Sequence, residues 1–68
     1  MTDITIRALK ACTTLAEAKD LASGMRETLI VVSNAHGESH PTTKVFRDRY
    51  EKFVDEMAYR YNKGFLPA

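Results

Sequence analysis

The 68-residue sequence has few of the cysteine and histidine residues that stabilise very small proteins through disulfides or bound metal ions. It contains a single cysteine, Cys12, so no disulfide can form within the chain, and a disulfide-rich secreted scaffold is excluded. A hydrophobic core at this length contributes only about 3–5 kcal/mol, and small folds often add a disulfide, a metal ion or a second subunit. A metal ion, oligomerisation or close helix packing therefore remain as sources of stability.

The sequence also lacks an excess of charge of either sign and any long apolar run. Ten Lys and Arg residues stand against nine Asp and Glu residues, so the net charge is +1 and there is no basic arm or acidic tail. The longest apolar run is LIVV, whereas a membrane-spanning helix needs about 20 residues. The first ten residues lack the basic-then-apolar order of a signal peptide. We therefore expect a soluble cytoplasmic protein with no membrane contact.

The apolar residues of the first half recur at alternating spacings of four and three residues. They are Ile4, Ala8, Ala11, Leu15, Ala18, Ala22, Met25, Leu29 and Val32. This alternation is typical of a helical face that packs against a partner helix. Ile6 and Leu9 lie off this face, which indicates that a short helix over residues 3–12 buries a different face, with a break near Cys12 and Thr13.

A second helix is predicted from about Leu15 to Asn34. Thr14 and Glu17 have the spacing of a capping box, in which the hydroxyl accepts from a free backbone N–H and the carboxylate reaches back to the cap. Gly24 costs about 1 kcal/mol relative to alanine inside such a helix, so we expect it to mark a kink or the close approach of another backbone.

A competing interpretation assigns strands to the same part of the chain. Residues 28–34 contain three β-branched residues in a row, which favour a strand, and residues 4–11 would supply a second strand. The result would be a small α+β fold with β-α-β-α order. The continuous helical spacing of the apolar residues favours the all-α alternative.

A third helix is predicted over residues 42–63. Its apolar residues recur at helical spacing and are Phe46, Tyr50, Phe53, Met57 and Tyr61. Ser39 or His40 can cap its start, and Pro41 suits a first helical turn because its missing N–H would have no partner there. Gly64 is a typical stop signal, and we expect Phe65 to fold back onto the apolar stripe.

Together these signals predict one small all-α domain over residues 1–68. It would consist of a short N-terminal helix followed by an antiparallel helical hairpin. Two helices of about 20 residues enclose little core, and Ile30, Val31 and Val45 lack obvious cover within the chain. We therefore expect a homodimer in which two hairpins form a four-helix bundle.

The loop between the two long helices contains His36, Glu38 and His40, which are residue types that can bind zinc or nickel. Gly37 and Pro41 disfavour a helix here, but in an extended segment alternate side chains point the same way. A fourth ligand and a rigid support are not evident. The preferred interpretation is a polar turn without a cofactor, and a metal site is the alternative.

Candidate catalytic residues are equally scarce. Cys12 lies near a helix start, where backbone amides could lower the pKa of its thiol, but no histidine is positioned beside it in the sequence. A partly buried cysteine more often acts as a small apolar residue. No catalytic residue is assigned, and we do not expect an enzyme.

One surface pattern indicates a binding site. On a helical projection of residues 42–63, four basic residues cluster beside an outward-facing tyrosine; the set is Arg49, Lys52, Tyr59, Arg60 and Lys63. Such a group suits contact with an acidic protein surface or with phosphates.

We therefore expect a small non-enzymatic protein-interaction module: an adaptor, inhibitor or regulatory subunit of the kind found among bacterial and phage regulators. The alternative is a DNA-binding regulator of the ribbon–helix–helix type, with residues 3–9 as the strand and Thr5 and Arg7 directed at bases. The near-zero net charge weakens that alternative because phosphate contacts dominate affinity for DNA.

Overall fold

The chain forms a helical hairpin with a short helix across one of its faces. The computed structural model describes the backbone of residues 4–68 and the side chains of residues 6–68. It contains α1 (Ile4–Ala11), α2 (Leu15–His36) and α3 (Pro41–Asn62), with no strand in this described part. The all-α prediction is confirmed and the β-α-β-α alternative is wrong, because both proposed strand segments are helical. Asp3 and the side chain of Thr5, which belonged to those predictions, lie outside the described residues.

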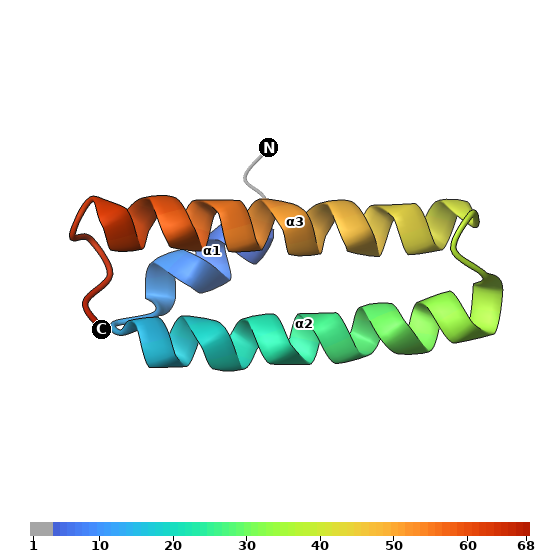
Figure 1. The fold of residues 1–68 in the computed structure, drawn as a ribbon, viewed down its shortest axis with the longest axis horizontal. Helices are drawn as coiled ribbons and strands as arrows, with labels where there is room; N and C mark the ends of the chain where they lie inside the picture. Colours follow the sequence, from blue (N-terminus) through green and yellow to red (C-terminus); the bar gives the residue numbers. More distant parts are fainter. Residues whose placement is uncertain (1–3) are drawn as a thin grey trace.

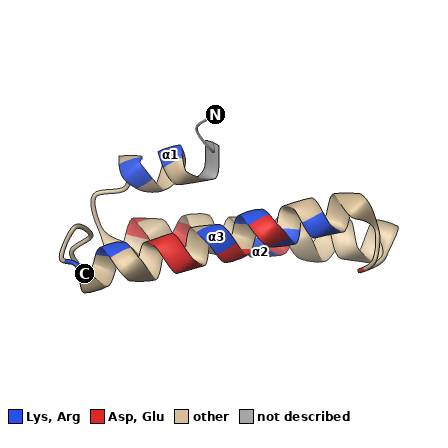
Figure 2. Ribbon diagram, turned by 90° about the horizontal axis from the view of Figure 1, so that it is seen from above, with Lys and Arg blue, Asp and Glu red and all other residues tan. Residues whose placement is uncertain are grey.

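The three helices are arranged in two layers. The helices α2 and α3 run antiparallel along the length of the molecule, and α1 lies near the end that holds the C-terminus (Figure 1). Seen from above, α1 stands on one face of the α2–α3 layer and leaves the half nearer the interhelical loop uncovered (Figure 2). Among the described residues, no helix has both the length and the apolar character needed to cross a membrane.

Side-chain caps fix the break between α1 and α2. Thr14 is the N-cap of α2, and its hydroxyl accepts a hydrogen bond from the Glu17 backbone N–H at 3.3 Å. The return half of the predicted capping box is shifted by one residue, because the Glu17 carboxylate accepts from the hydroxyl of Thr13 at 2.6 Å. The two threonines together hold the chain in the extended turn that separates the helices.

The loop between α2 and α3 is held at both ends. The helix α2 continues two residues beyond the predicted end, to His36, and Gly37 then turns the chain with a φ of 89°. The Nδ1 atom of His40 accepts from the Thr42 N–H at 3.1 Å and caps α3, which begins at the expected proline. The hydroxyl of the fully buried Thr43 donates to the Gly37 carbonyl at 2.7 Å and ties α3 to the turn.

The core is small and lies between α1, the middle of the hairpin and the C-terminal tail. Its buried members are Leu9, Ala18, Ala22, Phe53 and Leu66. Leu9 is buried although it lies off the long apolar face, so the prediction that the first helix buries a different face is confirmed.

The C-terminal tail packs differently from the prediction. Gly64 has a φ of 81°, and the Phe65 N–H donates to the Arg60 carbonyl at 2.9 Å, the pattern of a Schellman turn. This turn directs Phe65 to solvent, where it is 68% exposed, and Leu66 into the core, where it is 2% exposed. The expectation that Phe65 folds back is therefore wrong, and Leu66 takes that place.

Candidate partner-binding groove

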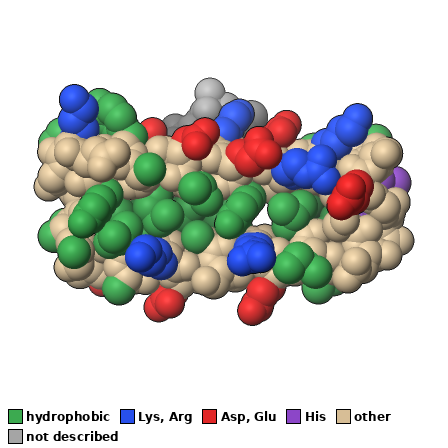
Figure 3. Space-filling model, viewed as in Figure 1, with side chains coloured by type: hydrophobic (Ala, Val, Ile, Leu, Met, Phe, Trp, Pro, Cys, Tyr) green, Lys and Arg blue, Asp and Glu red, His purple; other side chains and the backbone are tan. Residues whose placement is uncertain are grey.

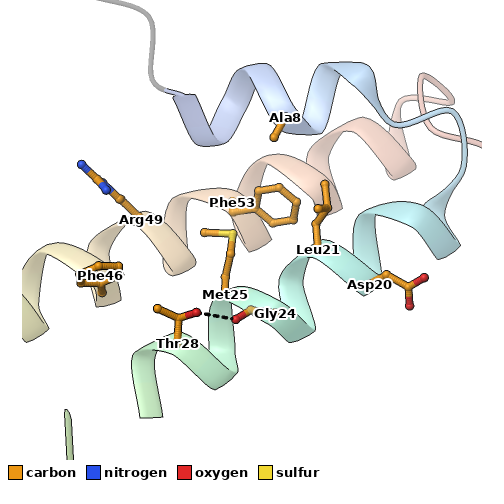
Figure 4. A pocket seen from close by; sticks show the side chains of 9 residues that line it. All are labelled: Ala8, Asp20, Leu21, Gly24, Met25, Thr28, Phe46, Arg49 and Phe53. Atoms are coloured by element: carbon orange, nitrogen blue, oxygen red, sulfur yellow. Dashed lines mark hydrogen bonds between the residues drawn. The ribbon is translucent and has the colours of Figure 1, made fainter. Parts of the chain in front are cut away.

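The face that carries α1 hollows into a groove beside that helix. The groove has a volume of about 500 Å³ and lies between all three helices. Its lining residues are Ala8 from α1, Asp20, Leu21, Gly24, Met25 and Thr28 from α2, and Phe46, Arg49 and Phe53 from α3 (Figure 4). The helix α1 forms one wall, so its position determines how much of the hairpin face stays open.

The floor and walls of the groove are mostly apolar. Phe53 is fully buried, and its ring lies between α3 and α2 near Met25 and Leu21 (Figure 4). Leu21 is 41% exposed, while Met25 and Phe46 are half-buried. Apolar side chains therefore line a concave surface that the described residues leave open, which is a common property of binding sites.

Gly24 helps to keep the groove open. A Cβ atom added at this position would have no neighbouring atom within 4 Å, so no other backbone approaches it closely. The expectation of a close approach is therefore wrong. The helix α2 continues through Gly24 without interruption, and the Thr28 hydroxyl donates to the Gly24 carbonyl at 3.0 Å (Figure 4). The missing side chain leaves space that a larger residue would fill.

Two charged side chains border the groove from different helices. Asp20 lies on α2, and Arg49 lies on α3, away from Asp20 (Figure 4). The Arg49 guanidinium carbon lies 6.0 Å from the centroid of the Phe46 ring, a cation–π distance. The groove therefore offers an apolar floor with one cationic and one anionic contact at its border.

The predicted basic cluster on α3 is only partly brought to this groove. Arg49 lines it, whereas Arg60 forms an ion pair with Glu56 at 3.1 Å and is half-buried. Tyr59 is 53% exposed, and the Lys63 ammonium lies 5.8 Å from the centroid of its ring. Lys52 is exposed on α3 between these groups.

The apolar groove residues were not identified as a site from the sequence. Helical spacing assigns Met25 and Phe46 to helix packing and indicates no role for Leu21, because the exposure of these side chains depends on where α1 lies. Two local signals were available in retrospect: a glycine inside a long helix, and Leu21, a large apolar residue off the regular spacing.

The histidines of the loop come together without forming a ligand set. The rings of His36 and His40 lie 4.7 Å apart between centroids and are tilted by 31°. Nδ1 of His40 is already used as the helix cap. In the part of the chain that the structure describes, no three residues among His, Cys, Asp and Glu are grouped to hold a metal ion, and Glu38 does not complete one.

The environment of Cys12 is opposite to that of an activated thiol. Burial raises the pKa of the Cys12 thiol, and the negative charge of Glu17 raises it further. The thiol lies 3.4 Å from the Ala8 carbonyl, to which it donates. The alternative in which helix amides lower this pKa is therefore wrong, because partial burial and a nearby carboxylate both favour the neutral thiol.

Comparisons with protein-family models, curated proteins and solved structures found no match to this chain.

Proposed function

We propose that this protein is a non-enzymatic interaction module that binds a helical segment of a partner protein in the groove between α1, α2 and α3. The observation that carries the proposal is the open apolar groove beside α1, with Leu21 exposed on its wall and Phe53 at its floor. An amphipathic helix that places its apolar side chains in such a groove is a recurring mode of protein recognition. An adaptor, an inhibitor or a regulatory subunit would act in this way.

The apolar surface continues beyond the groove toward the loop, which favours a chain segment over a small molecule. Val31 follows Thr28 by three residues on α2, and Val45 precedes Arg49 by four on α3, so both extend the same side of the hairpin. Val31 is 66% exposed and Val45 is 47% exposed. A small ligand in the groove would leave these two residues in water, whereas a helix along the hairpin would cover them.

The charges on α3 favour a partner helix with acidic residues along one side. Arg49 borders the groove, and Lys52 follows it by three residues on the same exposed flank. Opposite charge on the partner would orient the helix and accelerate its association more than it would increase its affinity. The proposed partner is therefore an amphipathic helix with apolar anchors and an acidic edge over α3.

Nucleic-acid binding remains the alternative function. The strand on which a ribbon–helix–helix interpretation depended is the helix α1, and Arg7 is exposed on it. We further propose that the protein acts in the cytoplasm and that two copies pair as a four-helix bundle.

The test is a pull-down from host lysate with the wild-type protein and two matched variants. Leu21→Lys places a charge in the groove, and Ser23→Lys adds the same charge at an exposed position of α2 outside it. Each sample is divided into nuclease-treated and untreated halves, and the retained proteins are identified by mass spectrometry.

A partner protein that survives nuclease, is lost with Leu21→Lys and is retained with Ser23→Lys supports the proposal. Equal retention by both variants would contradict the groove as the binding site. Retained material that disappears on nuclease treatment would instead support the nucleic-acid alternative.

A further inference from the structure

The face opposite α1 carries a second apolar surface. Apolar side chains run along the junction between α2 and α3, with cationic side chains along the α2 border and carboxylates along much of the α3 border (Figure 3). The helix α1 lies on the other side of the hairpin and does not reach this surface (Figure 2). Within the described chain, this surface has no covering segment.

Helical spacing identifies the residues of this surface. A shallow hollow on it is lined by Leu29 and Ile30 of α2 together with Arg47 of α3. Residues seven apart share a side of a packed helix, so Val54 and Tyr61, which follow Arg47 by seven and fourteen residues, belong to the same face, as does Leu15, which precedes Leu29 by fourteen. Tyr50 and Met57 lie four residues before Val54 and Tyr61 and so adjoin them on α3. The open stripe, as we call it, consists of Leu29, Ile30, Val54 and Tyr61 together with the partly buried Leu15, Tyr50 and Met57, whose inner sides pack against the core. Ile30 is 48% exposed and Tyr61 is 43% exposed.

The charges on the two borders of the open stripe are of opposite sign. Lys19 and Arg26 are seven residues apart and form the α2 border, whereas Glu51 and Asp55 lie beyond Val54 on the α3 border. All four charged side chains are exposed. Arg47 and the exposed Lys44 are exceptions on α3, and both lie nearer the loop. In the hollow, Arg47 lies beside uncharged residues of α2 and Glu38 of the loop.

The loop places these charges at matching heights along the hairpin. Arg26 lies ten residues before the end of α2 at His36, and Glu51 lies ten residues after the start of α3 at Pro41. Lys19 and Asp55 differ in height by three residues, or about 4.5 Å at the helical rise, which a lysine side chain can span.

We propose that the open stripe binds a second copy of this chain, with α2 of each copy lying over α3 of the other. A twofold axis parallel to the helices produces this arrangement. It leaves every residue at the same position along the helix axis in both copies. Arg26 of each copy then faces Glu51 of the other, and Lys19 faces Asp55. A twofold axis perpendicular to the helices would instead place α2 over α2, with Arg26, at the middle of that helix, against its own equivalent. Like charges in that position oppose association.

The dimensions of the molecule suit such a dimer. The molecule extends 37 × 25 × 17 Å, so the broad face measures 37 × 25 Å. A stable interface buries about 800 Å² per partner, which this face can supply only if most of its length takes part. Two such layers form a four-helix bundle, in which the half-buried Val54 and Met57 become core residues.

This inference rests on the dimer proposed above, but it is independent of the groove, which lies on the opposite face. A second copy and a partner helix can therefore be bound at the same time.

The test is the mass of the full chain in solution, measured by sedimentation over a concentration series, for three charge-reversal variants. The first carries Lys19→Glu and Arg26→Glu, the second carries Glu51→Lys and Asp55→Lys, and the third carries all four changes. Circular dichroism confirms that each variant keeps its helical content. Leu21→Lys, in the groove, is the control that should leave the mass unchanged.

We expect the wild type to reach twice its chain mass of 7.7 kDa. Each double variant should self-associate at least tenfold more weakly, because like charges face each other. An equimolar mixture of the two double variants should restore the dimer, and so should the fourfold variant alone, whose net charge is that of the wild type.

A wild type that stays at the monomer mass throughout would overturn both the dimer and its surface. A dimer that persists in both double variants would overturn the surface alone, and a failure of the fourfold variant to dimerise would overturn the charge pairing. None of these outcomes depends on the groove, so a failed partner pull-down is distinguishable from a failed dimer.

Discussion

Replacing Gly24 by larger residues distinguishes its effect on the stability of the protein from its effect on partner binding in the groove. Glycine inside a helix costs about 1 kcal/mol relative to alanine, mainly because its unfolded backbone is more flexible. A Cβ atom at this position would meet nothing within 4 Å, so Gly24→Ala introduces no clash. We therefore expect Gly24→Ala to raise the free energy of unfolding by about 1 kcal/mol. For a domain of this size, that corresponds to an increase in Tm of about 4–8 °C.

The same position controls the space available to a partner helix. Gly24→Leu should keep the gain in helix propensity, since its side chain extends into the open groove and not into the core. It should nevertheless reduce binding of the partner at least tenfold, because the groove is then occupied. Ser23→Leu is the matched control, at an exposed neighbouring position that does not line the groove.

Thermal unfolding followed by circular dichroism measures the stability of both leucine variants and of Gly24→Ala, and titration against the captured partner measures affinity. A Gly24→Ala variant that is less stable than the wild type would refute the reasoning, because it would mean that another part of the molecule approaches this glycine. Equal partner affinity for Gly24→Leu and Ser23→Leu would refute the role of the groove.

Three further predictions follow from single contacts. Thr43→Val should lower the free energy of unfolding by about 1–3 kcal/mol in urea titration, because a loop carbonyl loses its buried donor; an unchanged value would contradict that role. Leu66→Ala should cost about 2–5 kcal/mol, whereas Phe65→Ala should stay within about 0.5 kcal/mol, and the reverse order would contradict the tail packing. Because Glu17 raises the pKa of the Cys12 thiol, Glu17→Gln should lower that pKa and accelerate alkylation by iodoacetamide near neutral pH; a slower rate would contradict the assignment.

The ends of the helices were predictable because local chemistry determines them. Thr14 is a cap in the structure as in the sequence, Pro41 begins α3, and Gly64 ends it with a positive φ. Each of these residues acts through backbone atoms within four or five positions along the chain. Such signals do not depend on how the helices pack, so a single sequence is enough to place them.

The groove was not predictable because it depends on the path of α1. Met25 has the spacing of a core residue, and it becomes part of a groove wall only because α1 stops short of the loop (Figure 2). The difference between the expected packing of Phe65 and the observed packing of Leu66 in the core has a similar origin. The turn at Gly64 decides which of two adjacent apolar residues faces inward, and the Leu15 N–H then holds the tail at the Pro67 carbonyl at 2.6 Å.

The predicted basic cluster on α3 was likewise predictable only in part. Helical spacing correctly placed Arg49, Lys52 and Tyr59 on one helix, but it could not show that Arg49 borders a groove while Arg60 is held by Glu56. Spacing determines the direction of a side chain from its own helix. The neighbours it meets are determined by the other helices.

The most direct test of the central claim is photo-crosslinking from the groove in cell lysate. A benzophenone-bearing analogue of phenylalanine replaces Phe46, which lines the groove, and in a second variant it replaces Tyr61, on the open stripe. We predict that position 46 crosslinks to a distinct partner protein and that position 61 crosslinks to a second copy of the chain. Crosslinks from position 46 that contain only a second copy or nucleic acid would contradict the proposal that the groove binds a partner helix.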